Sequence, residues 1–138
     1  MLDDTTLDSA MKIGELAEKA NLSSRTIRHY GDVGLLVPSG RSEGGFRLYT
    51  ASDLTRAVLI RRVKALGFAL DELVNLLTVI DTLHQLDSES DGAIMWTELD
   101  RFLAEAIARR AKLEDYLRRG DELIEMLSDL SDRRHDRR

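Results

Sequence analysis

The sequence predicts a mainly α-helical chain, in which a small head made of a helix-turn-helix and a β-hairpin precedes one long helix. Two short segments with apolar residues on one face flank a turn at residues 21–23, as in two packed helices. Paired glycines at residues 44–45 between short extended segments indicate a hairpin. From about residue 95, apolar residues recur at steps of three and four over four heptads, the pattern of a coiled coil.

Composition limits the classes of protein to which the chain can belong. Its 138 residues suffice for one domain, or for a small domain with an extension. The sequence has no cysteine, which excludes disulfides, thiolate metal sites, iron–sulfur clusters and a cysteine nucleophile. No apolar run approaches the ~18 residues of a membrane span, and the acidic N-terminus lacks the pattern of a signal peptide. We therefore expect a cytoplasmic protein that has no membrane partner.

The charges are distributed unevenly along the chain, whose net charge is −5. Residues 12–70 carry ten Lys and Arg against five Asp and Glu, whereas residues 71–138 carry ten against seventeen. Such an asymmetry is typical of a basic binding head attached to an acidic body. Chance clustering on a solvated surface explains the charge pattern equally well when it is taken alone.

The head is expected over residues 11–82, after a disordered acidic stretch at residues 1–10. Its first helix is predicted at Met11–Ala20. A serine at position 23 or 24 is suited to cap the second helix, which Gly34 ends. Two short helices around such a turn predict a helix-turn-helix.

A β-hairpin and two further helices are expected to complete the head. Gly44 and Gly45 lie at the hairpin turn, where glycine accepts a positive φ without steric cost. The segment Thr50–Asp53 resembles a capping box and predicts a third helix that extends to about Leu66. A fourth helix is expected at Leu70–Thr82.

The rest of the chain is divided into a linker at residues 83–94, a coiled-coil helix at residues 95–130 and a frayed charged tail at residues 131–138. A helix of about 35 residues spans roughly 50 Å, more than a small head can cover, so its apolar stripe needs a partner. A second copy of the chain is the most economical partner, and folding back onto the head is the alternative. Arg110 and Gly120 interrupt the stripe. The residues predicted to form the dimer are Leu99, Phe102, Leu103, Ala106, Leu113, Leu117, Ile124 and Leu127.

The sequence from Lys12 to about Ile80 resembles the DNA-binding domain of MerR-type bacterial transcription regulators. The segments that carry the resemblance are KIGELAEKANLSSRTIRHY, VGLLVPSGRSEGGFRLYTASDL and IRRVKALGFALDEL, in the order and spacing of that family. The resemblance implies a winged helix-turn-helix head, followed by a long dimerisation helix that pairs in an antiparallel coiled coil.

For function, the resemblance implies a homodimer that binds inverted repeats in promoter DNA. The second helix of each head would enter a major groove, and the hairpin, or wing, would contact the neighbouring backbone. The dimer would bend and undertwist the spacer between promoter elements, so that RNA polymerase engages both, which is readout through deformation of the duplex.

The resemblance also assigns residues to the DNA contact. Arg28 is expected to reach base edges or phosphate, and Arg47 is the strongest candidate for a phosphate contact. Each assignment has a structural alternative: the two tyrosines can be core aromatics, the phenylalanine can pack the wing, and the last two arginines can be ordinary surface charge. The DNA-contacting residues so predicted are Arg25, Arg28, Tyr30, Arg41, Phe46, Arg47, Tyr49, Arg61 and Arg62.

One position departs from the family pattern in a way that bears on this contact. Where the family has a glutamate after an aromatic-tyrosine pair, this chain has Gly31 after His29 and Tyr30. The change removes a carboxylate that could orient a neighbouring arginine. It also lowers the stability of the helix by about 1 kcal/mol relative to alanine.

The sequence contains little that would identify an effector. Met95, Trp96 and Phe102 form a candidate pocket for a small apolar ligand, although ordinary packing of the helix start explains the same residues. The acidic residues Asp87, Glu89 and Asp91 lack the spacing of a calcium loop and are interpreted as a solvated linker. We therefore expect neither a metal site nor a cofactor.

Two classes of function remain in competition. The first is a dimeric regulator that binds promoters. The second is a coiled-coil adaptor whose helix-turn-helix docks on another protein. An enzyme is not expected, because the sequence shows no catalytic Ser/His/Asp grouping and no glycine-rich loop that could hold a phosphate.

Overall fold

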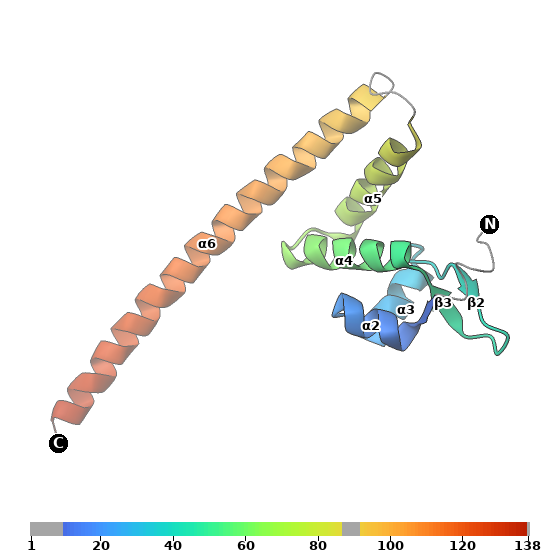
Figure 1. Cartoon of the computed structure of the whole chain (residues 1–138). Helices are drawn as coiled ribbons and strands as arrows, with labels where there is room; N and C mark the ends of the chain where they lie inside the picture. The colour runs from blue at the N-terminus through green and yellow to red at the C-terminus, as the bar shows by residue number, and fades with distance from the viewer. Residues whose placement is uncertain (1–9, 87–91, 138) are drawn as a thin grey trace. The chain divides into compact units, whose positions relative to one another are not determined.

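The computed structural model describes residues 10–86 and 92–137 of the chain (Figure 1). They form two compact units that divide between Leu77 and Thr78, within helix α5 (Leu70–Gln85). The first unit is the head, and the second contains the end of α5 and the long helix α6 (Ala93–Asp136). Within these ranges, no helix combines the length and the apolar character needed to cross a membrane.

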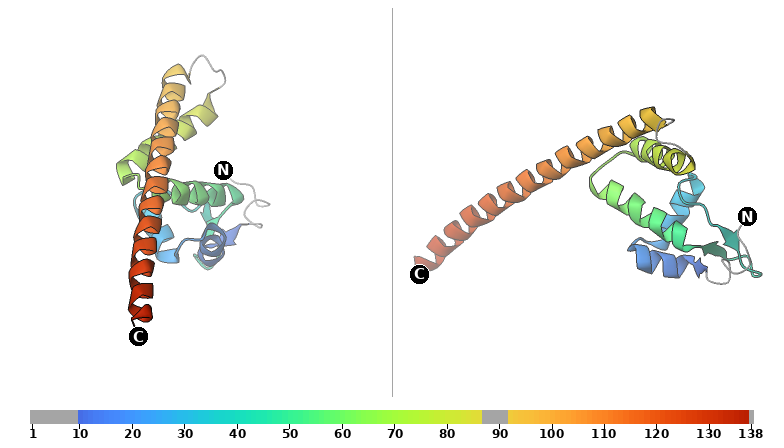
Figure 2. Two further views of the ribbon diagram at one scale, coloured as in Figure 1. Left: turned by 90° about the vertical axis from the view of Figure 1, so that its left-hand side faces the viewer. Right: turned by 45° about the horizontal axis from the view of Figure 1, so that its top comes forward.

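Three helices build most of the head: α2 (Ile13–Ala20), α3 (Ser24–Asp32) and α4 (Ala51–Ala65). Helix α2 contacts both α3 and α4, and two views of the ribbon show the three packed together (Figures 1 and 2). This arrangement confirms the predicted helix-turn-helix. The largest fully buried side chains are Tyr49, Leu16, Ile27, Leu36, Ile60, Leu73 and Leu77.

A three-stranded antiparallel sheet completes the head. Its strands are β1 (Met11–Lys12), β2 (Gly40–Arg41) and β3 (Arg47–Tyr49), in the order β1-β3-β2. The β2–β3 pair confirms the hairpin, but β1 was not predicted. Met11 and Lys12 were expected in the first helix, whereas they pair with Tyr49 and Leu48 of β3. The helix therefore begins only at Ile13, because a distant strand satisfies the backbone of the two residues before it.

The predicted helix caps are present. The Ser23 hydroxyl accepts a hydrogen bond from the Thr26 backbone N–H at 3.0 Å, which fixes the start of α3. Thr50 and Asp53 form a complete capping box at the start of α4. Just beyond α3, Gly34 has a φ of +79°, which favours glycine and turns the chain away from the helix.

Helix α4 fixes both ends of the segment that joins α3 to the wing. At one end, Arg56 Nε donates to the carbonyl oxygen of Leu35 at 2.8 Å. At the other end, the Ser39 hydroxyl donates to Asp53 Oδ2 at 2.5 Å. The same carboxylate oxygen accepts from the Thr50 backbone N–H at 2.8 Å. One carboxylate thus caps α4 and also holds the residue before β2.

The second unit is more helical than the sequence predicts. Helix α5 continues to Gln85, past the expected end at Thr82. Helix α6 continues to Asp136, so the prediction of a frayed tail at residues 131–138 is wrong for the described part of that segment. The last turn contains no helix breaker, and its basic residues 133–135 interact favourably with the unpaired carbonyl groups at the helix end.

Some sequence predictions fall on residues that the structure does not describe. The stretch predicted to be disordered at residues 1–10 lies outside the described residues except for its last member. Asp87, Glu89 and Asp91, in the predicted linker, also lie outside them.

Replacing Asp53 with alanine is expected to lower the free energy of unfolding by about 1–2 kcal/mol. The change removes the acceptor of the capping box and also leaves the part-buried Ser39 hydroxyl without its partner. Urea denaturation at a fixed protein concentration measures the effect. The control is Asp71→Ala, which removes an exposed carboxylate from the first turn of α5. Equal stability of the two variants would contradict the role of Asp53.

Candidate nucleic-acid interface

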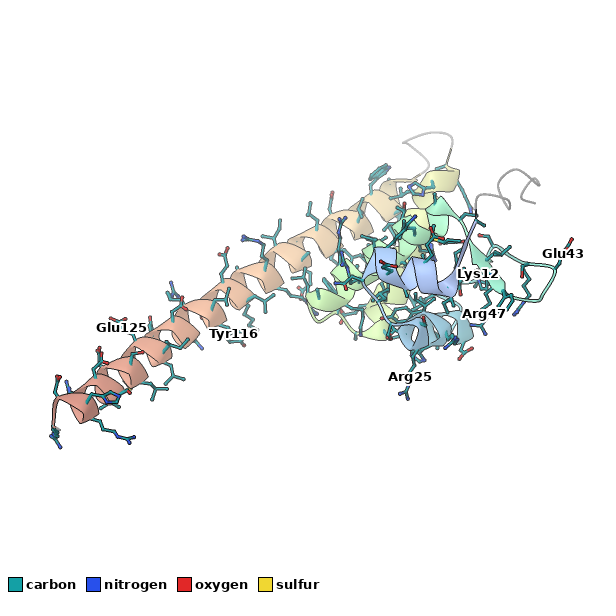
Figure 3. All side chains as sticks on the ribbon, turned by 60° about the horizontal axis from the view of Figure 1, so that its bottom comes forward. Lys12, Arg25, Glu43, Arg47, Tyr116 and Glu125 are labelled. Atoms are coloured by element: carbon teal, nitrogen blue, oxygen red, sulfur yellow. The ribbon has the colours of Figure 1, made fainter. Side chains whose placement is uncertain are left out.

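Helix α3 separates a buried face from a basic face. Ile27 is fully buried and Tyr30 is 7% exposed, so these side chains fix the helix against the head. Arg25 and Arg28 are exposed, and Figure 3 shows Arg25 projecting away from α3. Burial raises the pKa of Tyr30 above its ordinary value, so its hydroxyl stays protonated at neutral pH and can donate a hydrogen bond.

The wing is closed by its own side chains. The Ser42 backbone N–H donates to the carbonyl oxygen of Phe46 at 2.9 Å, and the Ser42 hydroxyl accepts from the Phe46 N–H at 3.1 Å. Gly45 has a φ of +82°, as the tight turn requires. Arg41 Nη1 donates to the Gly45 carbonyl oxygen at 3.0 Å. Arg41 therefore braces the wing while its side chain stays exposed.

Lys12 joins this surface, although sequence reasoning did not select it. Its Nζ lies 4.3 Å from the centroid of the Phe46 ring, in cation–π geometry. The Phe46 side chain is 58% exposed, and the Lys12 ammonium group lies above its ring. Lys12 reaches the wing because β1 pairs with β3. That pairing joins residues about 37 positions apart, so no local sequence pattern could have indicated it.

Arg47 lies where the returning wing strand passes α3. Its side chain is partly buried, and Nη1 would lie 3.9 Å from a Cβ atom added at Gly31. The two residues, sixteen positions apart in the sequence, are therefore neighbours in the head. Lys12 pairs with Leu48, the residue after Arg47, on the neighbouring strand. Figure 3 shows Glu43 farther out on the wing.

The arginines of the head and those of α6 differ in their partners. Among residues 10–86 and 92–137, no carboxylate pairs with any of the six arginines predicted to contact DNA. In α6, by contrast, Arg101 pairs with Glu98 at 2.7 Å and Arg110 with Glu114 at 2.6 Å. These six guanidinium groups thus have no carboxylate partner in the described chain, whereas Lys19 of the same head pairs with Glu15 at 3.1 Å. The six arginines are Arg25, Arg28, Arg41, Arg47, Arg61 and Arg62.

Residues 11–80 match the family model described as the MerR HTH family regulatory protein. The chain belongs to the MerR HTH family. It is 41% identical to the HTH-type transcriptional regulator ZntR of Escherichia coli (strain K12) over 78% of this chain and 73% of that protein. Membership of a family of regulators confirms that the chain is not an enzyme.

Solved structures of MerR regulators have the same fold. A MerR family transcriptional regulator from Bacillus cereus is 30% identical, with a TM-score of 0.60 over 87% of this chain and 78% of that one. HiNmlR, described as a MerR family regulator that lacks the sensor domain and is bound to promoter DNA, is 27% identical. Its TM-score is also 0.60, over 78% of each chain. These similarities confirm the winged helix-turn-helix prediction.

One residue predicted to contact DNA does not lie at the surface of this MerR-family head. Tyr49 is fully buried, and its hydroxyl has no hydrogen-bond partner among the described residues. It occupies the core because it lies on β3 opposite Met11 of β1, which is also buried. The prediction that Tyr49 assists Arg47 in a phosphate contact is therefore wrong for this conformation, and the alternative of a core aromatic holds.

The remaining predicted residues are distributed between the two units. Arg62 is exposed on α4, and Arg61 is partly buried. In the second unit, Trp96 is 43% exposed while Phe102 is 8% exposed. A Cβ atom at the buried Gly92 would lie 2.7 Å from Leu86 Cδ1 and 3.3 Å from Trp96, so these side chains pack closely around Gly92. This packing is of the ordinary kind that stands as the alternative to a ligand pocket at Trp96.

The structure gives no support to a metal centre in the parts of the chain that it describes. There, no three His, Asp or Glu side chains come together in a way that could hold a metal ion. The sequence itself contains no cysteine to supply a thiolate.

Replacing Tyr49 with phenylalanine is expected to raise the free energy of unfolding by about 1 kcal/mol, because it removes a buried hydroxyl that has no hydrogen-bond partner and keeps the ring. Thermal and urea unfolding measure the change. The control is Tyr116→Phe, since the Tyr116 side chain is exposed on α6. A loss of 1 kcal/mol or more in the Tyr49 variant would show that this hydroxyl has a partner.

Proposed function

We propose that this chain is a sequence-specific DNA-binding transcription regulator that acts as a homodimer on inverted repeats in promoters. The observation that carries the proposal is the set of six head arginines without carboxylate partners among the described residues, on a head of the MerR HTH family. Guanidinium groups without a carboxylate partner are suited to bind the phosphates of a duplex, because their binding releases the counterions condensed on those phosphates. The bound-promoter form of HiNmlR supports the same assignment.

The residues divide by the part of the duplex that they would contact. Arg25 and Arg28, exposed on α3, face the major groove, where arginine can bind the guanine edge in a bidentate manner. On the wing, Arg41, Phe46 and Arg47 lie against the neighbouring backbone, and the Tyr30 hydroxyl donates to a phosphate. Arg61 and Arg62 add backbone contacts from α4. Phosphate contacts position the head, and base contacts specify the site.

The proposed dimer forms through α6. A helix of 44 residues extends about 66 Å and displays an apolar stripe along it. Several members of the predicted seam are strongly exposed in the single chain, with Leu117 at 70% and Ile124 at 64%. An exposed stripe of this length is covered most economically by an antiparallel copy of the same helix. Phe102 contributes less to this surface, because it is already buried within the single chain.

Gly120 supports pairing rather than weakening it. The missing side chain leaves a hollow on the surface of α6, lined by Leu113, Leu117 and Ile124 among others. In coiled coils a side chain of one helix fills a hole between residues of the other. We assign this hollow to a side chain of the partner helix.

The rest of the proposal concerns the consequence for transcription. Two heads held at a fixed separation strain the spacer between promoter elements, and RNA polymerase responds to the altered duplex without being held by this chain. Such a protein works in the cytoplasm. Met95, Trp96 and Phe102 stay the proposed place for a small apolar effector. The alternative of a protein-docking adaptor is not favoured, since the relatives that match are transcriptional regulators.

Selection of bound sequences from a random duplex pool is expected to recover an inverted repeat. On that duplex, Arg28→Ala and Arg47→Ala should each weaken binding about ten-fold and lower the slope of log K against log salt by about one. Arg133→Ala, an exposed change in the last turn of α6, serves as the control. A duplex affinity that does not depend on salt would overturn the assignment.

Light scattering is expected to give a particle of twice the 15.6 kDa chain mass at micromolar concentration. Leu117→Glu should convert it to a monomer, because a carboxylate buried at the seam has no partner. The matched control is Ala108→Glu, which places the same charge nine residues away, two and a half turns along α6 and thus on its opposite side. If both variants were monomers, or neither, the proposal that the face of α6 containing Leu117 forms the dimer interface would be refuted.

A further inference from the structure

Gly120 is a glycine that the single chain does not require. It lies within α6 and is not among the described glycines with positive φ. A Cβ atom added to it would meet nothing within 4 Å, so no neighbouring group in the single chain excludes a side chain. Most other residues would favour the helix more than glycine does. The feature that remains to explain this glycine is the hollow that its missing side chain leaves.

The hollow at Gly120 is shaped to receive an apolar side chain. Its lining includes Leu113, Leu117 and Ile124, with Asp121 beside them. Gly120 follows Leu117 by three positions and precedes Ile124 by four, so the hollow lies on the apolar seam of α6. A side chain that enters it from a paired helix would bury its own apolar surface and that of the lining.

The register of the paired helices decides which side chain enters. In an antiparallel pair, one contact fixes all the others, because residue numbers rise along one helix as they fall along the other. Shifts by whole heptads keep the two seams opposed, and each such shift moves the partner about 10 Å along α6. The residues that face Gly120 in successive registers are Trp96, Leu103, Arg110, Leu117 and Ile124.

We propose that Leu103 of the partner subunit fills the hollow at Gly120 and so sets the register of the dimer. This inference rests on the proposed homodimer and names the contact that fixes it. The same register covers the apolar stripe from end to end, since Leu103 is itself 58% exposed in the single chain. The other apolar pairs that it forms are Trp96 with the partner's Leu127, Leu99 with the partner's Ile124, and Ala106 with the partner's Leu117.

Charged side chains lie at the edges of the seam in this register. Arg110 faces the partner's Leu113, and its Nη1 lies 2.6 Å from Oε1 of Glu114 in its own helix. Its methylene stem therefore covers the leucine while its charge stays at the solvated edge. The register also brings Asp121 toward the partner's Asp100. Both are exposed, and such like-charged pairs are screened by salt.

The other registers leave part of the stripe uncovered. With Leu117 opposite Gly120, Leu103 would face Arg134, and with Ile124 there it would lie beyond the end of the partner's chain. Two registers expose the opposite ends of the stripe. With Arg110 opposite Gly120, Leu99 would face Ser131, and with Trp96 there, Leu127 would lie before the start of the partner's α6.

Disulfide trapping tests the register directly, because the sequence has no cysteine of its own. The full-length Gly120→Cys variant is mixed with Leu103→Cys, and separately with cysteine variants at residues 96, 110, 117 and 124. A disulfide requires Cα atoms within about 7 Å, which a shift of one heptad prevents. The mixture with Leu103→Cys should form a covalent dimer at least about ten-fold faster than the other mixtures, and each variant alone should stay uncrosslinked.

An exchange of side-chain size provides a second test that needs no disulfide. Gly120→Leu should raise the dissociation constant of the dimer about ten-fold, because it fills the hollow that the partner's Leu103 occupies. Adding Leu103→Ala should restore the constant to within about three-fold of the unmodified protein, as a double-mutant cycle for two contacting residues requires. Adding Leu117→Ala instead is the matched control and should not restore it. Sedimentation equilibrium measures the three constants.

The outcomes separate this contact from the proposed dimer. Faster crosslinking of Gly120→Cys to another seam position would overturn the register, and crosslinking of Gly120→Cys alone would show a parallel pair. A tighter dimer in Gly120→Leu would show that the hollow is empty. In each case the dimer and its binding to the duplex would remain. A monomeric unmodified protein would overturn both the register and the proposed homodimer.

Discussion

The carboxylate of Asp53 is the interaction on which the geometry of the head depends. It caps α4 through the Thr50 backbone and accepts the Ser39 hydroxyl just before β2. Three residues farther along α4, Arg56 donates to the carbonyl oxygen of Leu35, just beyond α3. The connection between the basic helix and the wing is therefore held at both ends by the first two turns of one helix. This short span of α4 therefore fixes the separation between α3 and the wing, the two elements that the proposed function assigns to the duplex.

The features of the head that the sequence predicts are those with a local cause. The cap at Ser23, the capping box at Thr50, and the turns at Gly34 and Gly45 each follow from residues within about five positions of one another. The features of the head that the sequence does not predict have a non-local cause. Strand β1 exists only because β3 returns to pair with it, and that pairing also buries Tyr49 and brings Lys12 over Phe46.

Helix α4 and the end of α6 show two further limits of sequence reasoning. Apolar residues occur on several sides of α4, so their spacing does not identify the buried face, which contains Ala57, Ile60 and Val63. At the end of α6, a run of charged residues favours fraying in sequence terms, yet it carries no helix breaker and continues the helix. The charges of the two units also differ. Arg101 and Arg110 of α6 pair with carboxylates one turn away, at little gain in stability. Among the described residues, the six head arginines predicted to contact DNA have no such pair.

The way in which the wing is closed has a consequence for how such a head can diversify. Its tip, from Ser42 to Gly45, is held by hydrogen bonds to its own hairpin and by Arg41, while the anchors to α4 lie at Ser39 and before it. Insertions or exchanges at the tip therefore leave the spacing between helix and hairpin unchanged. The tip of the wing can therefore vary in sequence while the hydrogen bonds that hold the segment between α3 and β2 to α4 stay in place.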